Sequence, residues 1–210
     1  MKEKKTISNL DFLNIHIFSL ALYISLKPLY IFQNSPVQLA DIFLLLNFAH
    51  LIIKCKGKIS VNYPEKIFCI IILYQFIVNI TSFIIFRGRT IETVSLLKNN
   101  FYYIFNIIAM IYITLLFNVL KKRVLKGIAI GFTLSMIIIL IGLVLNLGTS
   151  RNTSFFNNPN QLGYHAVIVM TSIFLFKEAY SFFEKVICTT ISFLAVIMSA
   201  SIAALMAIIA

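Results

Sequence analysis

Long apolar runs constrain this chain more than any other feature of its 210 residues. A helix needs about 20 mostly apolar residues to cross the hydrocarbon core of a bilayer. The runs that meet this length without a charge are 67–86, 101–120, 128–147 and 186–210, and weaker candidates are 12–32, 37–53 and 159–176. Backbone groups within lipid must bond to one another, which favours helices. We therefore predict an all-α, polytopic transmembrane helical bundle of about seven helices, built as one domain over residues 1–210.

The charged residues exclude a water-soluble globule and orient the loops. Only 12% of the residues are charged, against roughly 25% in soluble domains. The net charge of +11 comes from clusters between the apolar runs, which is typical of cytoplasmic loops and not of a nucleic-acid-binding surface. The main clusters are Lys2, Lys4 and Lys5; Lys54, Lys56, Lys58 and Lys66; and Lys121, Lys122, Arg123 and Lys126. These alternate connections share a side, which predicts a multi-pass membrane protein with a cytoplasmic N-terminus and no nucleic-acid partner.

The two ends of the chain and its cysteines lead to three further predictions. Lysines precede the first apolar run, as in a signal peptide, but no small-residue cleavage site follows, and we predict a retained first helix. The last run ends at Ala210 without a polar anchor, so we expect the N-terminal part of a longer protein. The spacing of Cys55, Cys69 and Cys188 does not suit a metal, and we expect unpaired thiols.

One polar segment, residues 151–165, lies between two apolar runs on the side opposite to the lysine clusters. Asn158 is a favoured N-cap and Pro159 suits the first helical position, so this pair predicts a helix start. The free N–H groups and the positive dipole end of such a helix suit an anion such as phosphate. Arg151 supplies a guanidinium that holds phosphate oxygens in bidentate fashion.

The spacing within this segment leaves two interpretations open. Asn158, Gln161 and His165 are spaced i, i+3, i+7, which places them on one face of the helix, with His165 two turns below the surface. The first interpretation is an anion-binding site. In the second, Asn158 is only a cap, Arg151 only an interfacial anchor, and His165 a hydrogen-bonded residue of the bundle.

The order of residues in this segment resembles a known family. Arg151 followed by Phe155-Phe156-Asn157-Asn158-Pro159-Asn160-Gln161-Leu162-Gly163 is similar to the signature of the O-antigen ligase and polymerase superfamily, in which an arginine precedes a Phe-x-Asn-Pro-Asn helix start. Residues 28–46 and 198–205 are weaker matches to two flanking segments of that family. The second of these departs at Ile202, where family members often have arginine.

The resemblance implies a GT-C-like membrane glycosyltransferase fragment in the bacterial cytoplasmic (inner) membrane. Such a protein ligates or polymerises a polyprenyl-diphosphate-linked oligosaccharide on the outer side, for O-antigen, capsule or another surface polysaccharide. It implies a lipid or glycan acceptor and neither metal nor cofactor. Arg151, Asn158, Asn160 and Gln161 would bind the diphosphate and the glycan, and His165 would be catalytic. The family's large outer loop would lie beyond Ala210.

Other polar residues give weaker predictions. Arg87 and Arg89, with Lys98, are either a second substrate-binding anion patch or interfacial anchors. Asp41 is expected in the first turn of the second helix, where the helix dipole favours a carboxylate. Polar residues within the apolar runs are expected to face the bundle interior and to bond to one another, and they are His16, His50, Gln75, Asn79 and Asn106.

Two further functions remain open. The helices would also suit a transporter half or a flippase-like module for lipid-linked sugars, which needs polar residues at mid-depth on several helices. Here the polar groups gather at the outer mouth, which favours transfer over passage. The abrupt end at Ala210 also fits an inactive truncated remnant.

Overall fold

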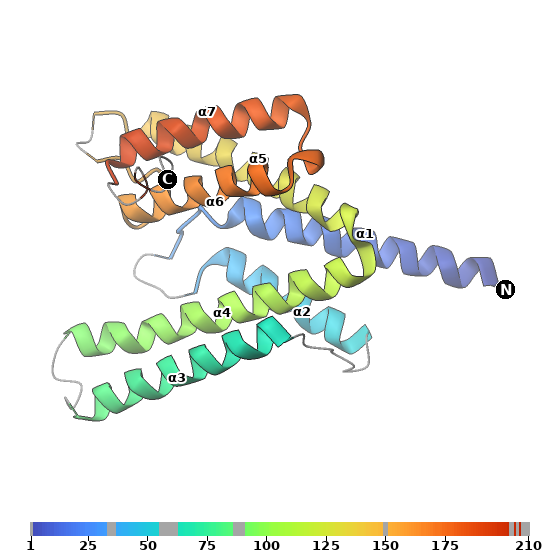
Figure 1. The fold of residues 1–210 in the computed structure, drawn as a ribbon, viewed down its shortest axis with the longest axis horizontal. Coiled ribbons are helices and arrows are strands. Elements are labelled where there is room, and N and C mark those ends of the chain that lie inside the picture. Colours follow the sequence, from blue (N-terminus) through green and yellow to red (C-terminus); the bar gives the residue numbers. More distant parts are fainter. Residues whose placement is uncertain are drawn as a thin grey trace.

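The computed structural model describes residues 2–32, 37–54, 63–85, 91–148, 151–201, 204 and 206, and for 2–13, 63–65, 91–99 and 101 it describes the backbone alone. Within these residues the chain forms seven α-helices and one short 3-10 helix, with no strand, so the predicted all-helical bundle is confirmed (Figure 1). The helices are α1 (Lys2–Leu26), α2 (Leu39–Lys54), α3 (Tyr63–Ile85), α4 (Ile91–Leu120), α5 (Lys122–Leu145), α6 (Pro159–Leu175), η1 (Lys177–Ala179) and α7 (Phe182–Ser199).

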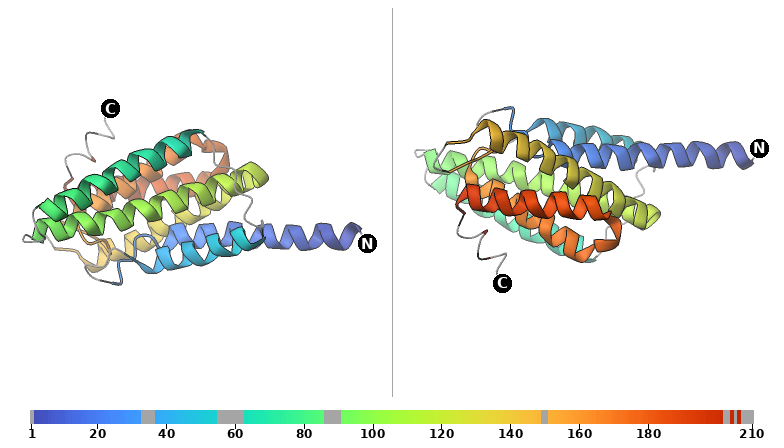
Figure 2. Two further views of the ribbon diagram at one scale, coloured as in Figure 1. Left: turned by 90° about the horizontal axis from the view of Figure 1, so that it is seen from below. Right: turned by 90° about the horizontal axis from the view of Figure 1, so that it is seen from above.

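Successive helices run in alternating directions, so their connections alternate between the two ends of the bundle (Figure 1). The starts of α3, α5 and α7 share one end with the N-terminal part of α1, which projects past the other helices (Figures 1 and 2). The described helix ends that flank the basic connections therefore lie at one end of the bundle, and the cytoplasmic location of that end stays a prediction. The polar segment 151–158 lies at the opposite end, between α5 and α6.

Two hydrophobic cores share helix α5. One core packs α5 against α6 and α7, and its most deeply buried members include Met136, Ile139, Leu162, Val169 and Ala195. The other packs the first half of α5 against α1 and α4, with α2 packed against those two helices, and includes Leu20, Leu44, Tyr112, Leu116 and Val124. Phe132, in the middle of α5, packs against both. Helix α5 therefore joins the two groups of helices.

Small residues on α5 allow α1 to approach closely. A Cβ atom added at Gly131 would stand 2.8 Å from Ile24 Cβ and 2.9 Å from the carbonyl oxygen of Ala21. One added at Gly127 would stand 2.8 Å from Ile17 Cγ2. Helices in lipid associate through such close van der Waals contact, because burial of apolar surface provides little net drive there. The Gly127–Gly131 spacing of four residues thus fixes the α1–α5 contact.

Two of the predicted runs extend well past the C-terminal end of their helix. The run 186–210 is not one helix: α7 begins earlier, at Phe182, and ends at Ser199, where Ala200 takes a left-handed conformation with φ of 48°. A capping box between Ser181 and Glu184 fixes its start. Helix α1 ends at Leu26, six residues before the end of the predicted run 12–32 and just before Pro28, which disfavours helical geometry in the residue preceding it.

Two of the polar residues within the apolar runs, His16 and Asn79, are buried and bond across helices, as predicted. His16 Nδ1 lies 2.8 Å from Tyr112 Oη, joining α1 to α4, and its ring stacks on that of His50. On α3, Gln75 donates to Asn79, and Asn79 donates to Asn100 on α4 over 2.6 Å. The prediction of an interior position was wrong for His50 on α2 and for Asn106 on α4, because both side chains are exposed.

Four helices in the described residues are long and apolar enough to cross a membrane: Lys66–Ile85, Tyr102–Leu120, Lys122–Leu145 and Phe182–Ser199. A shorter apolar helix covers Asn14–Leu26. Together with the large exposed apolar surface on these helices, this indicates a membrane protein.

Candidate functional site

The start of α6 has the predicted capped geometry. Asn158 is the N-cap, with an extended backbone, and its Oδ1 accepts from the backbone N–H of Gln161 over 3.0 Å. Pro159 occupies the first helical position. Because proline has no N–H and that of Gln161 is already bonded, Asn160 is the first-turn residue whose backbone N–H is left to a ligand. The sequence predicted free N–H groups at this helix start, and the structure leaves one of them, that of Asn160, for a ligand.

Arg151 is held over this helix start by two contacts. Its Nε donates to the carbonyl oxygen of Ser199 over 3.2 Å, and one terminal nitrogen donates to Asn160 Oδ1 over 3.1 Å. The side chain is exposed at the surface of the bundle. Among the described residues the ion pairs are Lys27–Asp41 and Lys126–Glu184, so none of their carboxylates neutralises Arg151. The guanidinium is thus positioned with its charge uncompensated, which suits an anion.

A buried asparagine fixes the backbone from which Arg151 projects. Asn152 is 1% exposed, and its Nδ2 donates to the carbonyl oxygens of Leu143 and Asn146 at the end of α5, both over 3.0 Å. Its Oδ1 accepts from the N–H of Ser154 over 2.7 Å, and its own N–H donates to Met198 over 2.9 Å. One side chain therefore caps α5, shapes the following turn and sits against the end of α7.

The turn that ends α7 closes the other side of the site. Ser199 turns its carbonyl oxygen to Arg151, and Ser201, which is 2% exposed, donates its N–H to Ser199 Oγ. This turn lies against α6 so closely that a Cβ atom at Gly163 would stand 2.8 Å from Ala204 Cβ and 3.0 Å from Ser201 Cβ. A residue larger than glycine at 163 would push the turn away from Arg151.

The connection between α1 and α2 lies against the same segment. The N–H of Tyr30 donates to the carbonyl oxygen of Phe155 over 3.3 Å, and its ring packs against that of Phe156. Burial, with Tyr102 and Asp41 nearby, raises the pKa of the Tyr30 phenol to about 12, so the hydroxyl stays protonated. Residues about 125 positions apart in the chain thus meet in the segment between α5 and α6.

Asp41 lies in the first turn of α2, as predicted, and is 1% exposed. One of its oxygens pairs with Lys27 and the other accepts from the N–H of Gln38 over 3.0 Å. This pair, with Asp41 buried and Lys27 half-buried, ties the end of α1 to the start of α2. Since Asp41 compensates the charge of Lys27, Arg151 is the stronger anion-binding candidate at this end of the described chain.

His165 lies deeper, on the buried face of α6. Its Nε2 stands 3.0 Å from Ser135 Oγ on α5, and its ring packs between those of Phe132 and Phe156. It lines a groove of about 500 Å³ between α1, α4, α5 and α6, whose wall is mostly aliphatic and aromatic. His165 contacts Ser135, Phe132 and Phe156. Arg151 bonds to Ser199 and Asn160, so the two side chains share none of these partners. A catalytic role for His165 stays a prediction.

The predicted site residues fall into three groups. The structure brings Arg151 and Asn160 into contact, and it assigns Asn158 to the helix cap. Gln161 is half-buried, with its Oε1 enclosed and without a hydrogen-bond partner, so this amide retains an acceptor. Arg87 and Arg89 lie outside the described residues. In the part of the chain that the structure describes, no cluster of His, Cys, Asp or Glu would hold a metal ion.

Sequence reasoning missed two parts of the site, the anchor Asn152 and the α7 turn at Ser199 and Ser201. The only signal for the turn was the weak family-like match of residues 198–205, within what hydropathy presents as a continuous span.

Comparisons with protein-family models, curated proteins and solved structures find no match to this chain.

Proposed function

We propose that this protein binds the diphosphate of a polyprenyl-linked oligosaccharide at Arg151 and takes part in transferring that oligosaccharide on the outer side of the bacterial cytoplasmic membrane. The observation that carries the proposal is the pose of Arg151. It is fixed by Ser199 and Asn160 over the start of α6, and no described carboxylate compensates its charge. A diphosphate at that point would meet the guanidinium, the N–H of Asn160 and the positive end of the helix dipole.

The arrangement of the rest of the chain supports this assignment. The basic connections at the other end of the bundle favour a cytoplasmic location for that end, which puts Arg151 outside. The groove beside His165 has an apolar wall along α6, which suits the hydrocarbon chain of a polyprenyl carrier. Described parts of the three segments that resemble the ligase and polymerase superfamily also meet at this end, through the Tyr30–Phe155 and Arg151–Ser199 hydrogen bonds and the approach of Gly163 to Ala204.

The proposed chemistry needs neither metal nor redox partner. An acceptor hydroxyl attacks the anomeric carbon of the first sugar, the bond from that carbon to the diphosphate oxygen breaks, and the hydroxyl proton passes to a base. Negative charge then develops on the departing diphosphate. Arg151, already in place before the reaction, would stabilise that charge, which is the usual largest catalytic contribution of a fixed cation.

The test is binding of a polyprenyl diphosphate to the purified chain in nanodiscs, measured by calorimetry. Replacement Arg151→Ala should weaken binding about 10- to 100-fold, as expected for loss of a charge-assisted, bidentate contact. Arg151→Lys should recover part of the affinity, because it restores charge without the fork geometry.

The matched control is Arg123→Ala, which removes an exposed arginine at the opposite end of the bundle. Its affinity should equal that of the unchanged protein. Equal affinities for Arg151→Ala and Arg123→Ala would refute the proposed role of Arg151.

A further inference from the structure

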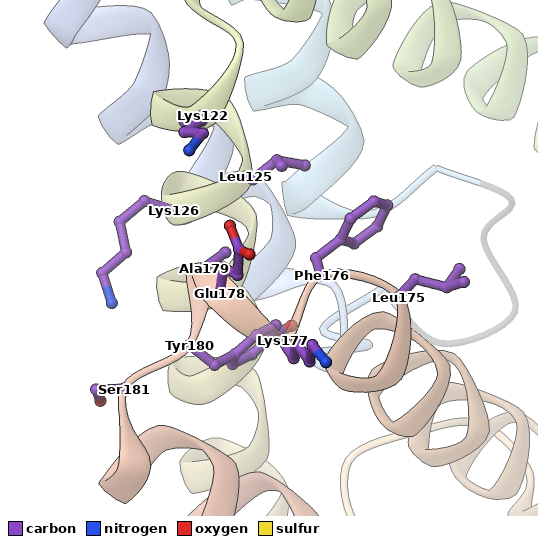
Figure 3. A pocket seen from close by; sticks show the side chains of 10 residues that line it. All are labelled: Lys122, Leu125, Lys126, Leu175, Phe176, Lys177, Glu178, Ala179, Tyr180 and Ser181. Atoms are coloured by element: carbon purple, nitrogen blue, oxygen red, sulfur yellow. The ribbon is translucent and has the colours of Figure 1, made fainter.

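A second cavity lies at the basic end of the bundle, far from Arg151. It has a volume of about 560 Å³ and lies between the first turns of α5 and the connection from α6 to α7. Figure 3 shows Lys122, Leu125 and Lys126 on α5 beside the η1 segment that carries Lys177 and Glu178. The cavity is large enough for a lipid headgroup.

The lining is predominantly cationic. It contains three lysines, Lys122, Lys126 and Lys177, and one carboxylate, Glu178. Lys126 is engaged by Glu184, at 2.7 Å. Lys122 and Lys177 form no ion pair with any described carboxylate, and both side chains are exposed. Two lysines without an ion pair, Lys122 on α5 and Lys177 on η1, therefore line the cavity together with one unpaired carboxylate, Glu178.

The two helix ends beside the cavity carry partial charges of opposite sign. Helix α5 begins here without a side-chain cap, which leaves its positive end available. Helix α6 ends here and contributes the partial negative charge of its last carbonyls. Each end amounts to about half an elementary charge, so the two nearly cancel. The ammonium groups of the lysines decide the sign of the potential.

Exposed apolar side chains adjoin the cavity. Phe174 and Leu175, at the end of α6, are 84% and 62% exposed, and Phe182 and Phe183, at the start of α7, are 74% and 75% exposed. Rings and aliphatic chains at the ends of membrane-spanning helices enter the lipid, whereas lysines reach out to the headgroups. The cavity thus has cations on its walls and a lipid-facing apolar border.

We propose that this cavity binds the phosphate of an anionic phospholipid, with the acyl chains against Leu175 and the phenylalanines beside it. The combination of uncompensated lysines with an apolar border fits a ligand that is anionic at one end and hydrocarbon at the other. A free phosphate would use only the first feature. The site is separate from Arg151 and does not depend on the proposed transfer of glycans.

The experiment compares phosphatidylglycerol with phosphatidylcholine, added to the purified full chain in detergent and counted as bound lipid by native mass spectrometry. The double replacement Lys122→Glu with Lys177→Glu should weaken phosphatidylglycerol binding by more than about 30-fold, because it removes the contribution of two lysines near an anionic lipid surface and adds two carboxylates that repel the phosphate. The neutral pair Lys122→Gln with Lys177→Gln covers the case in which charge reversal prevents folding, and should also weaken binding.

The matched control is Lys54→Glu with Lys66→Glu, which makes the same change in net charge at the same end of the bundle but outside the cavity. Selective loss in the cavity variants, with little change in the control, supports the proposal. Equal loss in cavity and control variants would show only general attraction to anionic lipid and would overturn it. Inorganic phosphate or glycerol phosphate that displaces the lipid at micromolar concentration would also overturn it, in favour of a site for a soluble anion.

Discussion

Helices α3 and α5 are both long, apolar and able to cross a membrane, yet α3 lies at the periphery of the bundle and α5 at its centre. Each helix contains an apolar stretch of 18 residues, of which 6% are buried in α3 and 39% in α5. Among the described helices α3 packs against α4 alone, whereas α5 contacts α1, α4, α6 and α7. Hydropathy selects both helices as spans but does not distinguish a peripheral helix from a central one.

The difference lies in small and polar residues. Helix α5 buries Gly127, Gly131, Ser135 and Gly142, whereas α3 has no glycine and exposes isoleucine, leucine and tyrosine side chains along most of its length. Because lipid is as apolar as those side chains, packing in the membrane depends on how closely two backbones approach and on hydrogen bonds between helices. A helix without glycine or alanine, such as α3, therefore stays at the periphery.

The largest expected effect comes from filling the α1–α5 contact. The replacement Gly131→Leu should lower the free energy of unfolding by about 3 kcal/mol, the upper range for overpacking, because its first added carbon already meets Ile24 and Ala21. Unfolding in mixed micelles monitored by circular dichroism measures this. The matched replacement Thr81→Leu, at an exposed position of α3, should leave stability nearly unchanged. If both variants lose the same stability, α5 is not the more tightly packed helix.

Identical truncations on the two helices compare their packing directly. Ile139→Ala, at a position that is 0% exposed on α5, should lower the free energy of unfolding by about 2 kcal/mol, at the low end for core truncation. Ile71→Ala, at a position on α3 that is 55% exposed, should change it by less than about 0.5 kcal/mol. Thermal unfolding of the two variants in the same detergent provides the comparison. A larger loss from Ile71→Ala would mean that a further surface covers α3.

The loop after α5 should depend on its buried asparagine. Asn152→Ala removes three side-chain hydrogen bonds, leaves carbonyl groups at the end of α5 unsatisfied, and should cost about 2 kcal/mol. It should also weaken ligand binding at Arg151, because the backbone of that residue would lose its support. The control Asn157→Ala changes an exposed amide of the same loop. Calorimetry and thermal unfolding on both variants test this, and equal behaviour would contradict the anchor role.

The smallest effect is expected in the α3–α4 hairpin. Asn100→Leu removes the hydrogen bond that Asn79 donates across the hairpin, and should cost about 1 kcal/mol, as for hydrogen bonds between helices in membranes. Asn106→Leu alters an exposed amide on the same helix and should not destabilise the protein. Protease susceptibility of the hairpin in micelles distinguishes the two variants. No difference between them would show that the Asn79–Asn100 bond contributes nothing.

Much of the architecture was predictable because hydropathy and helix capping are local properties. The number of helices, the cap at Asn158 and the position of Asp41 all followed from nearby residues. The end of α7 was not predictable in this way, because Ser199-Ala200-Ser201 is apolar enough to read as part of a span. Hydropathy averages over such a short turn.

The sequence by itself determined a bundle of apolar helices with one polar, capped helix start. The tertiary structure decided what that helix start faces. Arg151 is held by Ser199, 48 positions along the chain, and the loop that carries it is fixed by Asn152 against α5 and α7. Such pairs depend on how closely helices pack, which here is set by glycines at particular contacts and by buried hydrogen bonds. Hydropathy depends on composition along the chain, so it predicts neither the close helix contacts nor the hydrogen bonds between distant residues.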